Sequence, residues 1–113
     1  MAIVVASGVT VSTNANTKTA DLVTGVNQFV GKGTLVLAIR GSAAGMNVSL
    51  TVNGVPLVDD QAVASFGTTG ALSIIDHQMV NQAINGGRIQ LFLRNTSGGT
   101  LTTDYYLGFT PGK

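Results

Sequence analysis

Few residues in this chain are suited to acid–base chemistry. The single histidine, His77, directly follows Asp76. Adjacent residues of a helix do not face each other, so Asp76 cannot orient His77 as a catalytic carboxylate would. Ser65 or Ser73 could approach only through the fold, and no Gly-x-Ser-x-Gly turn presents a nucleophile. We therefore expect His77 to be a solvent-exposed residue in the first turn of a helix.

The best candidates for binding a metal are two adjacent carboxylates, Asp59 and Asp60. They could share a cation such as Ca²⁺, which takes several oxygen ligands. No Asp-x-Asp-x-Asp-Gly loop surrounds them, so turn-forming aspartates are the preferred interpretation and a metal bridge is the alternative. The chain has no cysteine, which excludes thiolate metal sites and thiol catalysis. The glycines of 41–45 and 98–99 do not fit a phosphate-binding loop. We expect no enzymatic activity and no cofactor.

Charge is unusually scarce in this sequence. Charged residues make up 10% of the 113 residues, against about 25% in a typical soluble domain. Binding the phosphates of a nucleic acid needs a clustered basic face. The six basic residues are instead scattered along the chain, at Lys18, Lys32, Arg40, Arg88, Arg94 and Lys113. This distribution argues against nucleic acid as a partner. A surface built from Thr, Ser, Asn, Gln and Gly tolerates contact with copies of itself. We expect a homo-oligomer, with a Thr-rich monomer as the alternative.

The length and the N-terminus bound the organisation of the chain. A chain of this length forms one domain, residues 1–113. The N-terminal Met-Ala-Ile-Val-Val-Ala lacks the basic region and the long apolar run of a signal peptide. No stretch approaches the ~20 apolar residues that a membrane span requires. These features predict a protein made in the cytoplasm and used without processing.

Alternation of apolar and polar residues predicts about eight short strands. The clearest are 34–40, 47–52, 55–58, 88–94 and 100–109; weaker ones are 3–5 with 9–12, 22–30, 62–66 and 71–75. The run 34–40 is apolar on both faces, as in a central strand. Asn53-Gly54 predicts a tight hairpin, and Pro56 places the following strand at a sheet edge. One short helix is predicted over 76–84, with Met79, Val80, Ala83 and Ile84 on one face.

Turn signals every 8–12 residues are typical of an all-β antiparallel sandwich, for which a jelly roll is the eight-strand version. A barrel is the main alternative. On the strand 88–94 an outward Phe92 stands between two arginines, a feature of protein interfaces, in the outward set Arg88, Gln90, Phe92 and Arg94. Coverage of Phe92 within the same chain, by a second sheet or by the predicted helix, is an equal alternative. Tyr106 could form an exposed platform for a sugar, although core or interface packing is preferred.

The run from Thr34 to Arg40, the Asn53-Gly54 hairpin and the closing hairpin 88–111 give the chain a texture that resembles small bacteriophage virion proteins. These are single jelly-roll shell, vertex or decoration subunits. The resemblance implies symmetric self-assembly within a virion and contacts with other virion proteins. The apolar N-terminal residues Ile3, Val4 and Val5 replace the basic arm of many coat proteins, which suits an outer layer or a strand lent to a neighbouring subunit. We expect a capsid or capsid-associated structural subunit; a module binding a glycan or a cell-surface receptor is the alternative.

Overall fold

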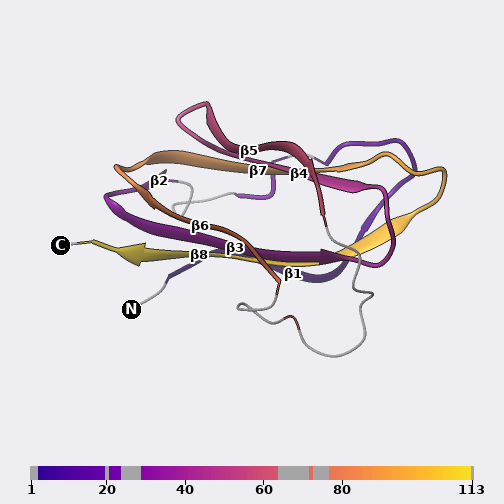
Figure 1. Cartoon of the computed structure of the whole chain (residues 1–113), viewed down its shortest axis with the longest axis horizontal. Coiled ribbons are helices and arrows are strands. Elements are labelled where there is room, and N and C mark those ends of the chain that lie inside the picture. Colours follow the sequence, from indigo (N-terminus) through magenta and orange to yellow (C-terminus); the bar gives the residue numbers. More distant parts are fainter. Residues whose placement is uncertain (1–2, 20, 24–28, 64–71, 73–76, 113) are drawn as a thin grey trace.

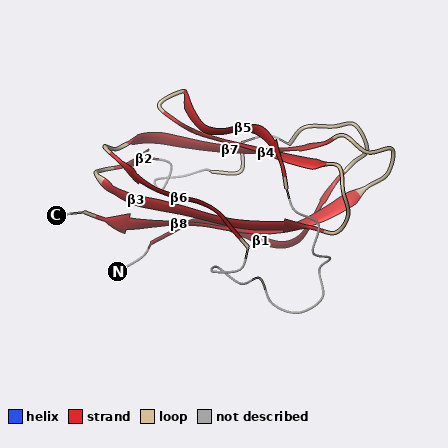
Figure 2. Ribbon diagram, in the orientation of Figure 1, coloured by secondary structure: helices blue, strands red, loops and turns tan. Residues whose placement is uncertain are grey.

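The protein folds into two packed β-sheets, as the computed structural model shows for residues 3–19, 21–23, 29–63, 72 and 77–112 (Figure 1). Strands account for nearly all of the regular structure in this part of the chain, and it contains no helix (Figure 2). Within the described residues, therefore, no helix is long and apolar enough to cross a membrane. The prediction of an all-β sandwich is confirmed, and the two separate sheets exclude the barrel alternative.

Within the described residues, each sheet contains four antiparallel strands. The first has the order β1-β8-β3-β6, made of β1 (Ile3–Thr13), β8 (Leu101–Pro111), β3 (Gly33–Gly41) and β6 (Gln78–Ile84). The second has the order β2-β7-β4-β5, made of β2 (Phe29–Val30), β7 (Gly87–Asn95), β4 (Met46–Val52) and β5 (Val55–Ala62). Strand 1 pairs with 8, 2 with 7, 3 with 6 and 4 with 5, as in one long hairpin rolled upon itself. This order is that of a jelly roll.

The core lies between the sheets and consists of the inward set of each alternating strand. β3, which lies between β8 and β6 as predicted for a central strand, contributes Leu35, Leu37 and Ile39. The largest fully buried hydrophobic side chains are Leu35, Leu37, Met46, Leu50, Ile89, Leu91, Leu93 and Leu107. Burial of such side chains contributes about 1.5–3 kcal/mol each, which makes this layer the main source of stability.

The β4–β5 hairpin forms where Asn53-Gly54 predicts it. Asn53 and Gly54 have φ angles of 52° and 78°, as a tight turn of this kind requires. The Asn53 side chain also fastens the hairpin to β7, because its Oδ1 accepts the amide of Arg88 at 3.0 Å. β5, which contains Pro56, is an edge strand as predicted.

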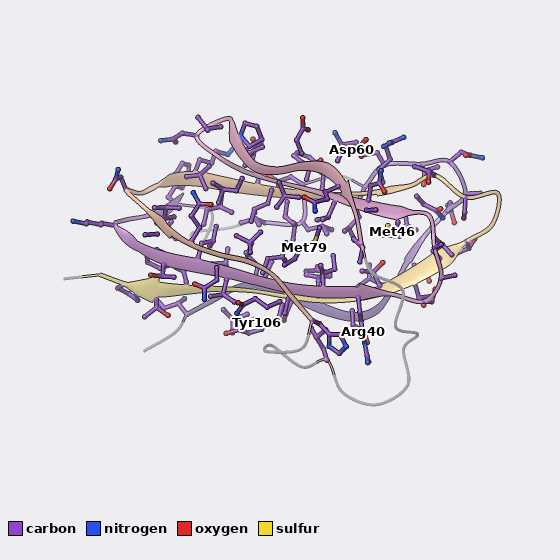
Figure 3. All side chains as sticks on the ribbon, in the orientation of Figure 1. Arg40, Met46, Asp60, Met79 and Tyr106 are labelled. Carbon is purple, nitrogen blue, oxygen red and sulfur yellow. The ribbon has the colours of Figure 1, made fainter. Side chains whose placement is uncertain are left out.

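The helix predicted over 76–84 is wrong. Residues Gln78–Ile84 form β6, which pairs antiparallel with β3, while Asp76 lies outside the described residues. The four apolar residues that suggested a helical face also suit a strand, since Val80 and Ile84 share its buried side. Short apolar runs are ambiguous in this way, and pairing with β3 decides between the two structures. Met79 lies at a register shift and points between the sheets (Figure 3).

The predictions of the remaining, weaker strands are confirmed in part. The pieces predicted at 3–5 and 9–12 form one strand, β1, with two irregularities in its pairing with β8. Of the predicted strand 22–30, only β2 is a strand among the described residues. Ala62 belongs to β5, and most of the strands predicted at 62–66 and 71–75 lies outside the described residues.

Candidate interaction surfaces

The outward face of the first sheet carries no exposed charge on its strands. Its four strands contain two charged residues, Arg40 on β3 and Asp104 on β8, which the ladder places opposite each other. Arg40 Nη2 donates to Asp104 Oδ2 at 2.6 Å, and Nε donates to the same oxygen at 2.9 Å. Both side chains are buried, with 4% and 2% of their surfaces exposed. We call β1-β8-β3-β6 the neutral sheet.

The outward positions of the neutral sheet are occupied by small, polar and apolar side chains. Alternation with the core set assigns to this face Val4, Ser7, Ser12, Thr34, Val36, Asn81, Ala83, Thr102, Tyr106 and Thr110, whereas Ala38 has the same orientation but is fully buried. Tyr106 lies on the outer side of the sheet (Figure 3). Its ring covers Gly108, where an added Cβ would lie 2.7 Å from a ring atom. Tyr106 is half-buried.

The second sheet displays its charges to solvent. Arg88 and Arg94 on β7 and Asp59 and Asp60 on β5 are all exposed. We call β2-β7-β4-β5 the charged sheet. The structure confirms that β7 is a strand with its inward set in the core, so its outward set shares one face of this sheet: Arg88, Gln90, Phe92 and Arg94.

Asp60 on β5 forms an ion pair with Arg94 on β7. Arg94 Nε donates to Asp60 Oδ1 at 2.8 Å, and Nη2 donates to Oδ2 at 2.5 Å. These hydrogen bonds lower the pKa of Asp60, and the same contact raises the pKa of Arg94. The described residues contain no group of three or more His, Asp or Glu side chains placed to hold a metal. The Asp60 carboxylate is engaged by a guanidinium, and both Asp59 and Asp60 lie within β5, so the interpretation of turn-forming aspartates after a strand is wrong.

Phe92 is covered in part by a residue that the sequence pattern did not indicate. The Lys18 ammonium lies 4.6 Å from the centroid of the Phe92 ring, a cation–π contact. Lys18 is held there because its backbone bridges to Arg94 and because Thr19 N donates to the Leu93 carbonyl at 2.8 Å. Lys18 lies outside the named strands, so the element that covers Phe92 is neither a sheet nor a helix. A polar hollow of about 340 Å³ adjoins it, lined by Asn16, Thr17, Lys18, Arg94, Asn95 and Thr96.

The N-terminal apolar residues divide between surface and core. Ile3 and Val4 are 43% and 46% exposed at the start of β1. Val5 is buried in the core, because the first irregularity of the β1–β8 pairing turns it inward. Only Ile3 and Val4 therefore contribute to the outer surface.

His77 precedes β6 instead of starting a helix. Its carbonyl accepts the amide of Ile39 at 3.0 Å, and the residue is half-buried. Ser65, Ser73 and Asp76 lie outside the described residues.

No family model, no curated protein and no solved structure matches this chain. The strand order defines the class as a jelly-roll sandwich. Jelly rolls carry many unrelated functions, so function has to be argued from the surfaces of this particular molecule.

Proposed function

We propose that this protein is a non-enzymatic structural subunit of a virus or phage particle, either a capsid or a capsid-associated protein. It acts by symmetric assembly with copies of itself and by contact with other proteins of the particle. The observation that carries the proposal is the neutral sheet, whose strands contain two charged residues that are paired with each other and buried.

Exposed charge normally keeps small proteins soluble and apart. A face made of Thr, Ser, Val and Tyr has no ionised group to desolvate when another surface covers it, so contact costs little. Each square ångström of apolar surface that becomes buried contributes about 25 cal/mol. A closed symmetric assembly repeats the same contact many times, so a modest interface per subunit is sufficient. The jelly-roll fold agrees with this reading, since viral capsid domains use it, as do lectins.

The test compares a charge placed on each sheet. Thr34 and Thr51 are both half-buried threonines on the outward side of a strand with neighbours on both sides, β3 in the neutral sheet and β4 in the charged sheet. We expect Thr34→Glu to abolish assembly, because it puts a carboxylate into the contact face. Thr51→Glu should leave assembly intact.

Multi-angle light scattering of the purified chain and its variants, followed by electron microscopy of large species, measures the result. The wild type should form multimers at micromolar concentration. A wild-type species of 11.5 kDa at every concentration tested would overturn the proposal. Equal assembly of the two variants would show that the neutral sheet is not the contact face.

A further inference from the structure

The sheet edges of this sandwich differ in how they are protected against pairing with another chain. β5 carries the usual protections of an edge strand, because it contains Pro56, Asp59 and Asp60 and its pairing with β4 shifts register twice. The positive φ of Asp60, 50°, adds a local distortion. A neighbouring chain would meet an irregular backbone and acidic side chains along this edge.

Two further edges are also interrupted or covered. Beyond β2, the outer edge of β7 is covered by Thr19 and Asp21, whose Oγ1 and Oδ1 accept the amides of Leu93 and Leu91 at 3.0 and 3.1 Å. β1 is uncharged, but its pairing with β8 is broken between Val4 and Ala6 and again between Gly8 and Val11. Such irregularities disrupt the straight ladder that a partner strand needs.

β6 lacks these protections from Val80 to Ile84. Over these five residues it pairs in unbroken register with β3, from Leu37 back to Gly33. The strand contains no charged residue and no proline. Val80 and Ile84 are buried, whereas Asn81, Gln82 and Ala83 are exposed. Among the described strands, β3 is the one neighbour of β6.

We propose that β6 pairs antiparallel with β6 of a second copy, about a two-fold axis that passes through Gln82. Together the two neutral sheets would form one continuous sheet. The inference rests on the proposed function in that it names the partner of assembly as another copy of this chain, and it adds the edge by which two copies join.

The sequence of β6 is complementary to itself in this register. Val80 lies opposite Ile84 of the second copy, Asn81 lies opposite Ala83, and Gln82 lies opposite Gln82. The first pair joins apolar side chains on the core side, and cross-strand pairs of this kind stabilise a sheet. The two Gln82 amides can each donate and accept a hydrogen bond across the axis. Because β6 has no charge, no like-charge repulsion arises when the strand meets itself. The same symmetry on β5 would bring its acidic residues together.

The first test places charges at the axis. Gln82→Lys and Gln82→Glu should each weaken pairing of the chain with itself by at least about tenfold, because identical charges then face each other. Mixing the two variants should restore pairing, since Lys then faces Glu. The matched control is Gln61→Lys, at a glutamine that is also exposed but lies on the β5 edge, and this variant should pair like the wild type. Analytical ultracentrifugation measures the equilibria, and circular dichroism checks that each variant is folded.

The second test uses the absence of cysteine from the chain. Opposed residues of an antiparallel pair have Cα atoms about 4.5–5.5 Å apart, within the range that a disulfide spans. Gln82→Cys should therefore oxidise to a covalent dimer of twice the 11.5 kDa chain mass, whereas Gln61→Cys should stay monomeric on a non-reducing gel.

Efficient assembly of all Gln82 variants, with no cross-link at this position, would overturn the β6 pairing and leave the proposed function standing. A wild-type chain that stops at a cross-linkable dimer would support the pairing and count against a shell. A wild-type monomer at every concentration, without cross-linking, would overturn both.

Discussion

The two sheets of this molecule each contain an arginine–aspartate pair, and the pairs differ in their exposure to solvent. Arg40 and Asp104 on the neutral sheet are 4% and 2% exposed, whereas Arg94 and Asp60 on the charged sheet are 45% and 42% exposed. Both pairs join residues far apart in sequence, and both use two guanidinium nitrogens. The chemistry is therefore the same and the surroundings differ.

The difference shows how one small sandwich can present two kinds of surface. Burial of Arg40 with Asp104 removes both charges from the outside of the neutral sheet, at the cost of desolvating two ions. The pair on the charged sheet stays in contact with solvent, so it adds little stability but leaves that face polar and charged. In the proposed assembly, the neutral sheet contacts copies of the protein and the charged sheet remains hydrated.

The largest expected effect follows from breaking the buried pair. Asp104→Ala removes the carboxylate that accepts two hydrogen bonds of Arg40 and leaves a buried guanidinium without that counter-charge. Such a loss costs about 3–5 kcal/mol. Replacing both residues, Arg40→Met with Asp104→Leu, should recover much of it, because neither ion then needs solvation. The unfolding midpoint in urea measures both variants.

Asp60→Asn is the control for this comparison, and its midpoint should lie close to that of the wild type, because solvent screens the exposed pair and Asn tolerates the positive φ at this position. A double variant as unstable as Asp104→Ala alone would show that the buried charges are needed for more than each other. Equal losses for Asp104→Ala and Asp60→Asn would remove the distinction between the two sheets.

A smaller effect concerns Tyr106 on the neutral sheet. Gly108→Ala places a methyl group 2.7 Å from a Tyr106 ring atom, so the ring has to move away from the strand. We expect a loss of about 1 kcal/mol in unfolding free energy, since a side chain rather than the backbone yields. Gly98→Ala is the control, because nothing lies within 4 Å of a Cβ there. Weaker assembly of Gly108→Ala relative to Gly98→Ala would place Tyr106 in the contact face; unchanged assembly would place it outside.

Local patterns predicted the strands that lie at the centre of the fold. Alternation identified β3, β4, β7 and β8, because each has one side in the core, and Asn53-Gly54 predicted a tight hairpin whose geometry requires residues of this kind. β6 was mistaken for a helix because its apolar residues fit both periods. β6 is an edge strand whose structure depends on pairing with β3. The alternation of its own seven residues does not reveal that pairing.

The candidate surfaces were predicted only where one strand supplies them. Arg88, Phe92 and Arg94 lie on one strand with a period of two, so their common face was visible in the sequence. The contact of Arg94 with Asp60 spans 34 positions, and that of Phe92 with Lys18 joins β7 to a loop. The neutral sheet was likewise hidden, since its strands come from both ends and the middle of the chain. Recognising it requires the strand order, which no local pattern supplies.

The smallest effect is the pH dependence of the exposed pair. Hydrogen bonds from Arg94 lower the pKa of Asp60 from its ordinary value of 3.8. A carboxyl whose pKa is lowered by folding stabilises the folded state above its unfolded pKa, and this contribution disappears as the pH falls through the folded pKa. Asp60→Asn removes the titration yet suits the positive φ of 50° at this position, since Asn tolerates that region. The difference in unfolding midpoint between wild type and Asp60→Asn should therefore be constant near neutral pH and shrink below pH 3.8.

This difference in midpoint should also shrink in ~1 M salt, where the Debye length is about 3 Å. A difference that persisted undiminished at pH ~2 would mean that Asp60 stabilises the fold through its shape rather than its charge. The stability that the exposed pair adds would then not depend on the ionisation of its carboxylate.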